Sequence, residues 1–540
     1  MRKKFIKEMA LVLSAATVMS SVTACSNSGG GNTETTTQAV TTAIDDGQGN
    51  GGQDNTSEDS GKKLAGDYSK EEPIEKIVLQ AEDGEFKGNV KVVESTDNGA
   101  TGKGYVDGFN ERGSDEWSYT FTVPQDGHYD FSISSNSGSD NNYKENYFKI
   151  DGQEVASFVS QSKNFRITKV RGSYLTEGEH TISIAVSWGY INLDKVTIET
   201  SEGVNPEIYN VSPKLVDENA TDNTKRLFSY LTDIYGTAFL SGQYCDAAYG
   251  MEMQSILLNT DPEVYPAILG LDMGYYSQSA VDHTANTSAT ENAIAYWEKD
   301  GGIVTYCWHW LPPDQYHTGE WYSTFRKENV KMNVTAMVNG EDPEGFELLM
   351  KDVDLIAEEF LKLQDAGVPV IWRPLHEASG GWFWWGAEGA DTYKKLYIAI
   401  YERLQEKGVH NLIWLWNGQN ADWYPGDKYV DIIGEDIYPG EHEHSSQVDK
   451  FLQAVDYTGG KKMVVLSENG CLFDPEQAVK DNAMWGFWAT WGGEFVLKSS
   501  NMNRYSEQYT SLDKLKEFYN SEYVITRDEL PDLKTYEIKE

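Results

Sequence analysis

The fold is decided by two stretches of sequence, Pro369-Val-Ile-Trp-Arg-Pro-Leu-His-Glu377 and Lys461-Lys-Met-Val-Val-Leu-Ser-Glu468. Each is an aliphatic run that ends in a glutamate and continues into a loop that contains glycine. A charge at the end of a buried strand is costly unless it has a partner or a chemical role. Two such carboxylates suit the acid/base and the nucleophile of glycoside hydrolysis, so we interpret Glu377 and Glu468 as a catalytic pair.

Similar runs recur through the C-terminal part of the chain and end in polar or aromatic residues. Eight are candidate strands: residues 237–243, 267–272, 303–309, 370–377, 412–417, 432–438, 463–468 and 486–491. Amphipathic stretches between them, such as 347–366 and 391–407, predict helices, the second with Asp391 as its N-cap. Eight strand–helix units over about 300 residues predict a (β/α)8 TIM barrel. About 90 residues, or three units of about 30, separate Glu377 from Glu468, which places them on strands four and seven.

The first 25 residues predict export and a lipid anchor. A basic head is followed by a mostly apolar stretch, 9–22, that is too short to span a membrane as a mature helix. It ends in Val22-Thr-Ala-Cys25, which resembles the lipobox of bacterial lipoproteins and implies acylation of Cys25. We therefore expect the protein to be anchored at the bacterial cell surface by lipid alone. Residues 26–72 are polar and predict a disordered linker.

The amino-acid composition limits the kinds of molecule that we expect the protein to bind. The chain has 45 basic and 85 acidic residues and a formal charge of −40, so nucleic acid and anionic membrane surfaces would repel it, whereas a neutral polymer would not. The 16 Trp and 32 Tyr suit sugar stacking and large cores equally. The remaining cysteines, Cys245, Cys307 and Cys471, are widely spaced and are expected to be buried free thiols. We expect a monomer.

Residues 73–200 show short alternating runs between turns, which predict a β-sandwich of the jelly-roll type, followed by a linker at 201–220 and the barrel domain at 221–540. The segment resembles carbohydrate-binding module family 35, or its relative family 6, through Gln80-Ala-Glu82, residues 104–110 and Asn192-Leu-Asp194. The resemblance implies a structural calcium held by Glu82 and Asp194, with Gln80 replacing a glutamate of many relatives. Tyr143, Trp188 and Asn192 are the candidates for a sugar-facing loop, with packing in the core as the alternative.

The barrel segment resembles glycoside hydrolase family 26. The resemblance rests on Trp372-Arg-Pro-Leu-His-Glu377, Gly381-Trp-Phe-Trp-Trp-Gly386, Cys307-Trp-His-Trp310, Gly434-Glu-Asp-Ile-Tyr438 and Ser467-Glu-Asn469. It implies a retaining endo-β-1,4-mannanase that acts on mannan, glucomannan or galactomannan and needs no cofactor for catalysis. Glu377 would be the acid/base and Glu468 the nucleophile.

The same resemblance implies roles for neighbouring residues. His309 and His376 would bind sugar hydroxyls or orient the carboxylates, Tyr438 would hold Glu468, and Trp382 and Trp491 would supply stacking faces. Arg373 is expected to keep the nucleophile ionised. The remaining polar residues at strand ends are expected to orient their neighbours: Gln243, Asp272, Glu435 and Asp436.

Two alternatives stay open. Family 26 also includes enzymes for β-1,3-xylan and mixed-linkage β-glucan, and the residues that choose the substrate are not identified by the motifs. The other alternative is a catalytically inactive surface glycan-binding protein, which loss of either glutamate would have favoured.

Overall fold

We describe the protein from a computed structural model, which covers residues 62–539 apart from 141, 246–249 and 499–500. The predicted signal segment, Cys25 and most of the predicted 26–72 linker lie outside the described residues. Two large hydrophobic cores are present, one formed by residues between 79 and 198 and the other by residues between 204 and 533. The chain therefore has two folded domains, which are described in turn.

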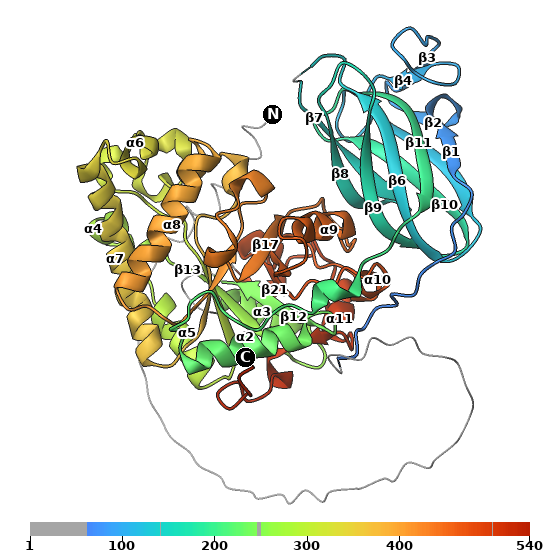
Figure 1. Ribbon diagram of the computed structural model, residues 1–540. Helices are drawn as coiled ribbons and strands as arrows, with labels where there is room; N and C mark the ends of the chain where they lie inside the picture. Colours follow the sequence, from blue (N-terminus) through green and yellow to red (C-terminus); the bar gives the residue numbers. More distant parts are fainter. Residues whose placement is uncertain (1–61, 141, 246–249, 499–500, 540) are drawn as a thin grey trace, which may run out of the picture. The chain divides into compact units, whose positions relative to one another are not determined.

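The N-terminal domain is a sandwich of two antiparallel sheets, as predicted (Figure 1). One sheet has the order β3-β4-β11-β6-β9, with β1 paired to β11, and the other has the order β2-β5-β10-β7-β8. The strands are β1 (Ile77–Gln80), β2 (Glu85–Lys87), β3 (Lys91–Val93), β4 (Tyr105–Asp107), β5 (Glu116–Val123), β6 (Gly127–Asn136), β7 (Lys144–Ile150), β8 (Gln153–Ser160), β9 (Arg166–Leu175), β10 (Gly178–Val186) and β11 (Asn192–Thr200).

The alternating runs that predict strands in this segment are residues 77–81, 117–123, 128–133, 147–150, 180–186 and 192–198, so β2, β3, β4, β8 and β9 were not predicted. Strand β8 shows why. Alternate side chains of a half-buried strand face the core. The buried face of β8 mixes polar and apolar residues, Glu154, Ala156, Phe158 and Ser160, while two valines, Val155 and Val159, lie on the partly buried face. Apolar residues therefore occur on both faces of this strand, and sequence alternation gives no reliable signal.

The C-terminal domain is a closed parallel barrel, as predicted (Figure 1). Its strands pair in chain order, and the ring closes between β19 and β12 and between β12 and β13. The eight strands are β12 (Phe239–Tyr244), β13 (Ile268–Asp272), β14 (Ile303–Cys307), β15 (Val370–Arg373), β16 (Leu412–Trp416), β17 (Ile432–Ile437), β18 (Met463–Asn469) and β19 (Phe487–Thr490). A two-residue strand, β22 (Val524–Ile525), pairs in parallel with the first two residues of β12 and is too short for a sequence pattern to reveal.

Helices connect the barrel strands and surround them in Figure 1. They are α2 (Asp222–Ile234), α3 (Met251–Asn259), α4 (Gln278–Asp282), α5 (Ala289–Glu298), α6 (Val334–Val338), α7 (Pro343–Asp365), α8 (Ala390–Glu406), α9 (Val448–Asp456), α10 (Pro475–Lys480) and α11 (Leu512–Tyr519). A short hairpin, β20 (Leu497–Lys498) and β21 (Asn501–Tyr505), precedes α11. Among the described residues, no helix combines the length and the apolar character that a membrane crossing requires.

The two predicted helices begin differently from expectation. Helix α7 starts at Pro343 and is capped by Asp342, whose carboxylate accepts the Gly345 N–H at 2.9 Å. Helix α8 begins after Gly389, so Asp391 lies in its first turn rather than at the N-cap. An acidic residue there still interacts favourably with the positive end of the helix dipole.

Candidate active site

Three carboxylates converge at the C-terminal ends of the barrel strands. Glu468 lies in β18, Asp436 lies in β17, and Glu377 follows β15 by four residues. One carboxylate oxygen from each lies within 4.8 Å of the others. This spacing is shorter than the separation of about 6.5 to 9.5 Å that an inverting glycosidase needs for its water, and it suits direct attack by one carboxylate.

Glu468 is held by a cation and by a phenol. The Arg373 guanidinium binds one Glu468 oxygen, and the Tyr438 hydroxyl donates to the other at 2.5 Å. Arg373 also donates to Asp436 at 2.6 Å, and its side chain is fully buried. A buried guanidinium is tolerated only when anions balance it, so Arg373 and the two carboxylates form one charge-paired unit. Both Glu468 oxygens are thereby fixed in position.

Glu377 occupies a loop rather than the end of a strand. The strand β15 stops at Arg373, and Leu375 and Glu377 adopt left-handed backbone conformations with φ of 51° and 52°. Such values are uncommon for these residue types and persist only where the surroundings hold them. The Glu377 N–H donates at 2.8 Å to both the main-chain oxygen and the side-chain oxygen of Asn417. The predicted strand 370–377 is therefore too long at its C-terminal end.

The surroundings of Glu377 favour its protonated form. Loss of water around the carboxyl group raises its pKa well above the usual value, and the negative charges of Asp436 and Glu468 raise it further. The Trp382 indole N–H donates to Glu377 at 2.8 Å and opposes this rise only weakly. A carboxyl group that keeps its proton near neutral pH is suited to general-acid catalysis.

The predicted histidines lie together beside the carboxylates. The His309 and His376 ring centroids are 4.7 Å apart, and His309 is 5.8 Å from the Trp491 ring. His376 is buried, and burial together with the Arg373 charge lowers its pKa well below the usual value. His376 is therefore neutral, whereas His309 keeps part of its ring accessible.

The aromatic residues predicted to contact substrate are accessible at the same end of the barrel. Trp382 and Tyr438 are each 41% exposed, and Trp491 is half-buried. Trp491 packs against Tyr244 with a centroid distance of 4.9 Å. Trp382 was predicted as a stacking face, and the structure adds its hydrogen bond to Glu377.

Asp436 was expected to orient its neighbours, and it contacts Arg373. Four further residues belong to the site and were not assigned to it by sequence reasoning. Tyr244 contacts Arg373, Asn417 holds the Glu377 backbone, and Phe325 and Phe383 pack against His309. Asn417 did fall at a predicted strand end, which was the available signal. The two phenylalanines follow no strand pattern that would have placed them at the site.

The N-terminal domain brings Gln80, Glu82 and Asp194 together around the loop at 101–103. Thr101 donates to Gln80 through its hydroxyl at 3.2 Å and to Asp194 through its N–H at 2.6 Å, and the Lys103 N–H donates to Glu82 at 2.6 Å. The second Glu82 oxygen is buried without a partner among the described residues. Ca²⁺ prefers oxygen ligands, and this cluster offers several, including a buried carboxylate oxygen that has no hydrogen-bond partner among the described residues. These residues therefore fit a calcium site.

The three residues predicted to face sugar in this domain differ in exposure. Tyr143 and Trp188 are 46% and 48% exposed, and their rings lie 5.6 Å apart. The Trp188 indole N–H donates to Glu145 at 2.9 Å. Asn192 is buried, and its amide donates to Asn136 at 2.8 Å. Tyr143 and Trp188 thus form an accessible aromatic pair, whereas Asn192 lies beneath the surface.

The remaining cysteines are not oxidised. Cys245, Cys307 and Cys471 are free and buried.

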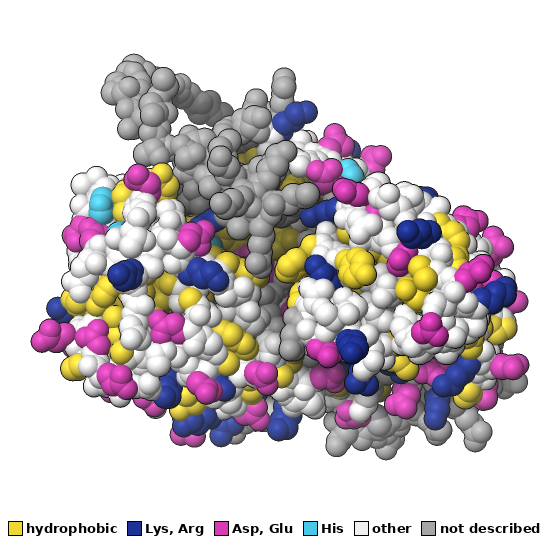
Figure 2. Space-filling model, turned by 90° about the horizontal axis from the view of Figure 1, so that it is seen from above, with side chains coloured by type: hydrophobic (Ala, Val, Ile, Leu, Met, Phe, Trp, Pro, Cys, Tyr) yellow, Lys and Arg dark blue, Asp and Glu magenta, His cyan; other side chains and the backbone are white. Residues whose placement is uncertain are grey.

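Acidic and basic side chains are interspersed with uncharged ones over the face drawn in Figure 2.

A closed (β/α)8 barrel with one carboxyl group in the loop after its fourth strand and the other on its seventh strand defines a retaining glycoside hydrolase. The model of glycosyl hydrolase family 26 matches residues 216–529, and that of carbohydrate-binding module family 35 matches residues 77–201. The chain belongs to glycosyl hydrolase family 26 and carries a family 35 module before its catalytic domain.

Relatives with known names resemble the chain over most of its length. A mannan endo-1,4-beta-mannosidase of Thermothelomyces thermophilus is 34% identical over 457 residues, which cover 84% of this chain and 90% of that protein. The mannan endo-1,4-beta-mannosidase B of a Piromyces species is 35% identical and covers 84% of this chain and 77% of its own. The crystal structure of a GH26-CBM35 beta-(1,4)-mannanase from Podospora anserina is 32% identical, with a TM-score of 0.58 and coverage of 85% and 99%.

Proposed function

We propose that the protein is a retaining endo-β-1,4-mannanase that hydrolyses internal linkages of mannan, glucomannan or galactomannan. The observation that carries this proposal is the pair of carboxyl groups held within 4.8 Å: Glu468 is bound by the Arg373 guanidinium, and Glu377 has a pKa raised well above its usual value by burial. The relatives named above, which resemble the chain over both domains, support mannan as the substrate.

The reaction proceeds by double displacement. Glu468, oriented by Arg373 and Tyr438, attacks the anomeric carbon while Glu377 gives its proton to the departing glycosidic oxygen. The bond from sugar to leaving group breaks, and a covalent glycosyl-enzyme forms. Glu377, now ionised, removes a proton from water, which attacks the anomeric carbon and releases Glu468. Two inversions give net retention.

The neighbouring residues position the sugar. His309 and His376 are placed to hydrogen-bond sugar hydroxyls, and Trp491 presents an aromatic face beside them. Aromatic faces suit the apolar C–H surface of a pyranose ring. Trp382 combines an exposed ring with a hydrogen bond to Glu377, so it links substrate binding to the acid/base.

The test of substrate is reducing-end release from glucomannan, galactomannan, β-1,3-xylan and mixed-linkage β-glucan. Rapid release of oligosaccharides from the mannans supports the proposal. Activity on xylan or glucan alone keeps the mechanism and overturns the substrate. Inactivity on all four together with retained glycan binding would identify a binding protein instead.

The test of residue roles uses Glu377→Ala and Glu468→Ala with an aryl β-mannoside and sodium azide. In Glu377→Ala the glycosyl-enzyme still forms with a good leaving group, and azide traps it as the β-azide. In Glu468→Ala azide replaces the missing nucleophile and yields the α-azide by a single inversion. The α-azide from Glu377→Ala together with the β-azide from Glu468→Ala would contradict the assigned roles.

The export sequence supports a location at the bacterial cell surface, with the protein held by acylation of Cys25. Cys25→Ala should move the protein from the membrane fraction to the culture medium, and the variant should fail to incorporate labelled palmitate. Retention of Cys25→Ala in the membrane fraction would contradict lipid anchoring.

We expect the protein to be a monomer, and light scattering of the protein lacking residues 1–61 would measure its mass in solution.

The family 35 module supports binding of a neutral plant glycan, with Tyr143 and Trp188 as its accessible aromatic pair. Affinity electrophoresis in gels that contain glucomannan should show retardation that is weakened by Trp188→Ala. Unchanged retardation would move the binding surface elsewhere on the module.

A further inference from the structure

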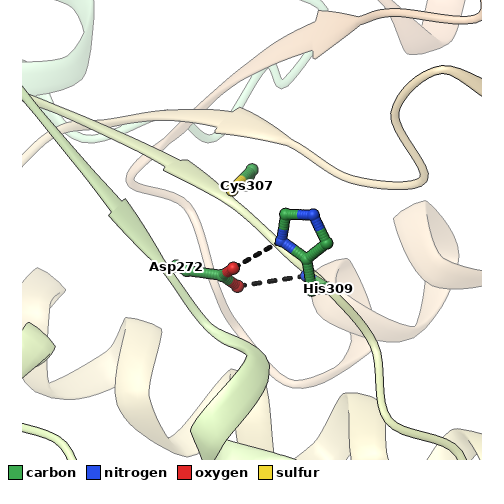
Figure 3. Close-up of side chains that lie close together, drawn as sticks. All are labelled: Asp272, Cys307 and His309. Carbon is green, nitrogen blue, oxygen red and sulfur yellow. Dashed lines mark hydrogen bonds and ion pairs between the residues drawn. The ribbon is translucent and has the colours of Figure 1, made fainter. Parts of the chain in front are cut away.

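Asp272 is the last residue of β13, and its carboxylate is held by three donors, two of which belong to His309 (Figure 3). One oxygen accepts the Gly274 N–H at 2.8 Å and the His309 N–H at 3.0 Å. The other oxygen lies 2.5 Å from the His309 Nδ1. Because two of the donors are backbone groups at strand ends, the orientation of the carboxylate does not depend on the histidine ring.

The His309 ring is fixed on its other sides by aromatic residues. Phe325, Phe383, His376 and Trp491 all pack against it at steep interplanar angles, with centroid distances of 4.7 to 5.8 Å. The Nε2 atom forms no hydrogen bond with the described residues, and it lies on the side of the ring away from Asp272 (Figure 3). The ring therefore has one satisfied nitrogen and one nitrogen available to a ligand.

We propose that Asp272 is a positioning residue that sets the tautomer of His309: it accepts the Nδ1 proton, so that the neutral ring presents Nε2 to the substrate as a hydrogen-bond acceptor. An ionised carboxylate has no proton to donate, and a neutral imidazole has one donor and one acceptor nitrogen. A carboxylate on Nδ1 thus leaves the lone pair on Nε2. The inference rests on the proposed function, because a sugar hydroxyl is the group that would donate to Nε2.

Asp272 is the anion of this pair. Burial alone would raise the pKa of Asp272, but the His309 side chain and the backbone N–H groups of His309 and Gly274 outweigh burial and hold it below its usual value. Asp272 is therefore ionised throughout the neutral range. The selected tautomer accepts a hydroxyl proton and rejects a sugar that offers only an acceptor at that position.

Metal binding is the rival explanation for this cluster, because donor atoms of Asp272, Cys307 and His309 lie within 4.8 Å of one another. A transition metal would require the Cys307 thiolate. Burial raises the pKa of the Cys307 thiol well above its usual value, and the thiol lies 3.7 Å from the Leu271 carbonyl, to which it donates. The hydrogen bond between Asp272 and His309 accounts for the geometry without a metal.

The decisive variant is Asp272→Asn. The Asn oxygen can still accept the two backbone N–H groups, but its NH₂ group donates to Nδ1 and forces the proton onto Nε2. We expect kcat/KM on mannan to fall about 10- to 100-fold, because the substrate hydroxyl would then face the His309 Nε2–H donor in place of an acceptor and would lose its hydrogen bond. Asp217→Asn is the matched control, since Asp217 pairs with the His410 Nδ1 at 2.9 Å and takes no part in the site.

Two readouts separate the proposal from a structural role. In a double-mutant cycle, Asp272→Asn should cost little in a His309→Ala background, whereas additive losses would overturn the proposal. Nitrogen NMR of ¹⁵N-histidine protein, with the His309 signals assigned by their loss in His309→Ala, should show Nδ1–H in the wild type and Nε2–H in Asp272→Asn. The same tautomer in both proteins would also overturn it. A wild type that cleaves no mannan refutes the proposed function, while the NMR result still judges the tautomer.

Discussion

At the scale of residues, the reaction centre is governed by charge. One guanidinium, Arg373, faces three carboxyl groups, Glu377, Asp436 and Glu468. Two of these groups have pKa values raised by burial: that of Asp436 rises to about 7, and that of Glu377 is raised well above its usual value. Because one cation cannot balance three anions in a buried site, the carboxyl group without contact to Arg373 keeps its proton.

Asp436→Asn should therefore weaken Glu377 as an acid at alkaline pH. Removing a negative neighbour lowers the pKa of Glu377, and Glu377 must be protonated to donate. The high-pH limb of kcat/KM should then move to lower pH by roughly one unit. Burial raises the pKa of Asp436 to about 7, so Asp436 carries most of its negative charge above that pH. The titratable groups that face the site are Tyr244 on β12, Arg373 on β15, His376 in the loop after β15, Tyr438 directly after β17, and Glu468 on β18.

Glu435→Gln is the control for this pH profile. Glu435 is adjacent in sequence and buried, its carboxyl group pairs with Tyr457, and its charge raises the pKa of Asp436 less than burial and Glu468 do. Its removal should leave the alkaline limb in place. An identical limb in Asp436→Asn and the wild type would contradict the electrostatic account.

Tyr438→Phe tests how the nucleophile is oriented. The variant removes the 2.5 Å hydrogen bond to Glu468 and keeps the aromatic ring. A hydrogen bond to a charged group contributes about 1.5 to 3 kcal/mol, so kcat should fall by about 10- to 100-fold with a smaller change in KM. A rise in KM at constant kcat would instead make Tyr438 a binding residue.

At the scale of elements, the loop after β15 sets the position of the acid/base. Leu375 and Glu377 have positive φ, and the loop is held by Asn417 from the end of β16 and by close packing of Gly386 against Ala378. A Cβ at Gly386 would lie 2.1 Å from the Ala378 carbonyl oxygen, so this approach requires glycine. Strain at a catalytic loop persists only while such contacts enforce it.

Gly386→Ala should push the loop away from Ala378 and displace Glu377. We expect kcat/KM to fall about 100-fold, the scale of loss that a 1 Å misplacement of a reacting group produces. Gly389→Ala is the control, because Gly389 lies three residues further along the same segment, and a Cβ there would meet no atom within 4 Å although its φ of 91° is positive. That variant should lose up to about 1 kcal/mol of stability and keep its activity. Equal activity losses in both variants would refute the packing argument.

At the scale of the whole molecule, the two domains have separate hydrophobic cores, and each can respond to its own ligand. The oxygen cluster of Gln80, Glu82 and Asp194 belongs to the sandwich, whereas the catalytic carboxylates belong to the barrel. Calcium should therefore stabilise the module without entering the reaction.

Calcium added to chelator-treated protein should raise the melting temperature of the module, because a ligand that binds only the folded state stabilises it. Differential scanning calorimetry would measure the shift, which should disappear in Glu82→Gln. Asp83→Asn is the control, since Asp83 is exposed and pairs only with Lys103. Hydrolysis of soluble mannan should not change. A melting temperature that does not change when calcium is added would contradict calcium binding at this cluster.

Most of the architecture was predictable because it depends on local patterns. Eight aliphatic runs separated by amphipathic segments specify a barrel, and all eight strands are present. Their ends were less predictable: β15 stops at Arg373 because Leu375 and Glu377 leave the extended conformation. In the sandwich, β8 was missed because its buried face mixes Glu154 and Ser160 with Ala156 and Phe158, while two valines lie on the other face, so only its packing in the sandwich shows which side faces the core.

The sequence by itself determined the two domains, the barrel class and the pair of glutamates, because strand period and charged strand ends are local features of the chain. The tertiary structure decided what surrounds that pair: Asp436 and Tyr244 on Arg373, Asn417 behind Glu377, and Asp272 on the His309 ring. These contacts join residues from different strands, separated by 37 positions for Asp272 and His309 and by 129 for Tyr244 and Arg373. Only the register of the closed barrel brings such residues within hydrogen-bonding distance.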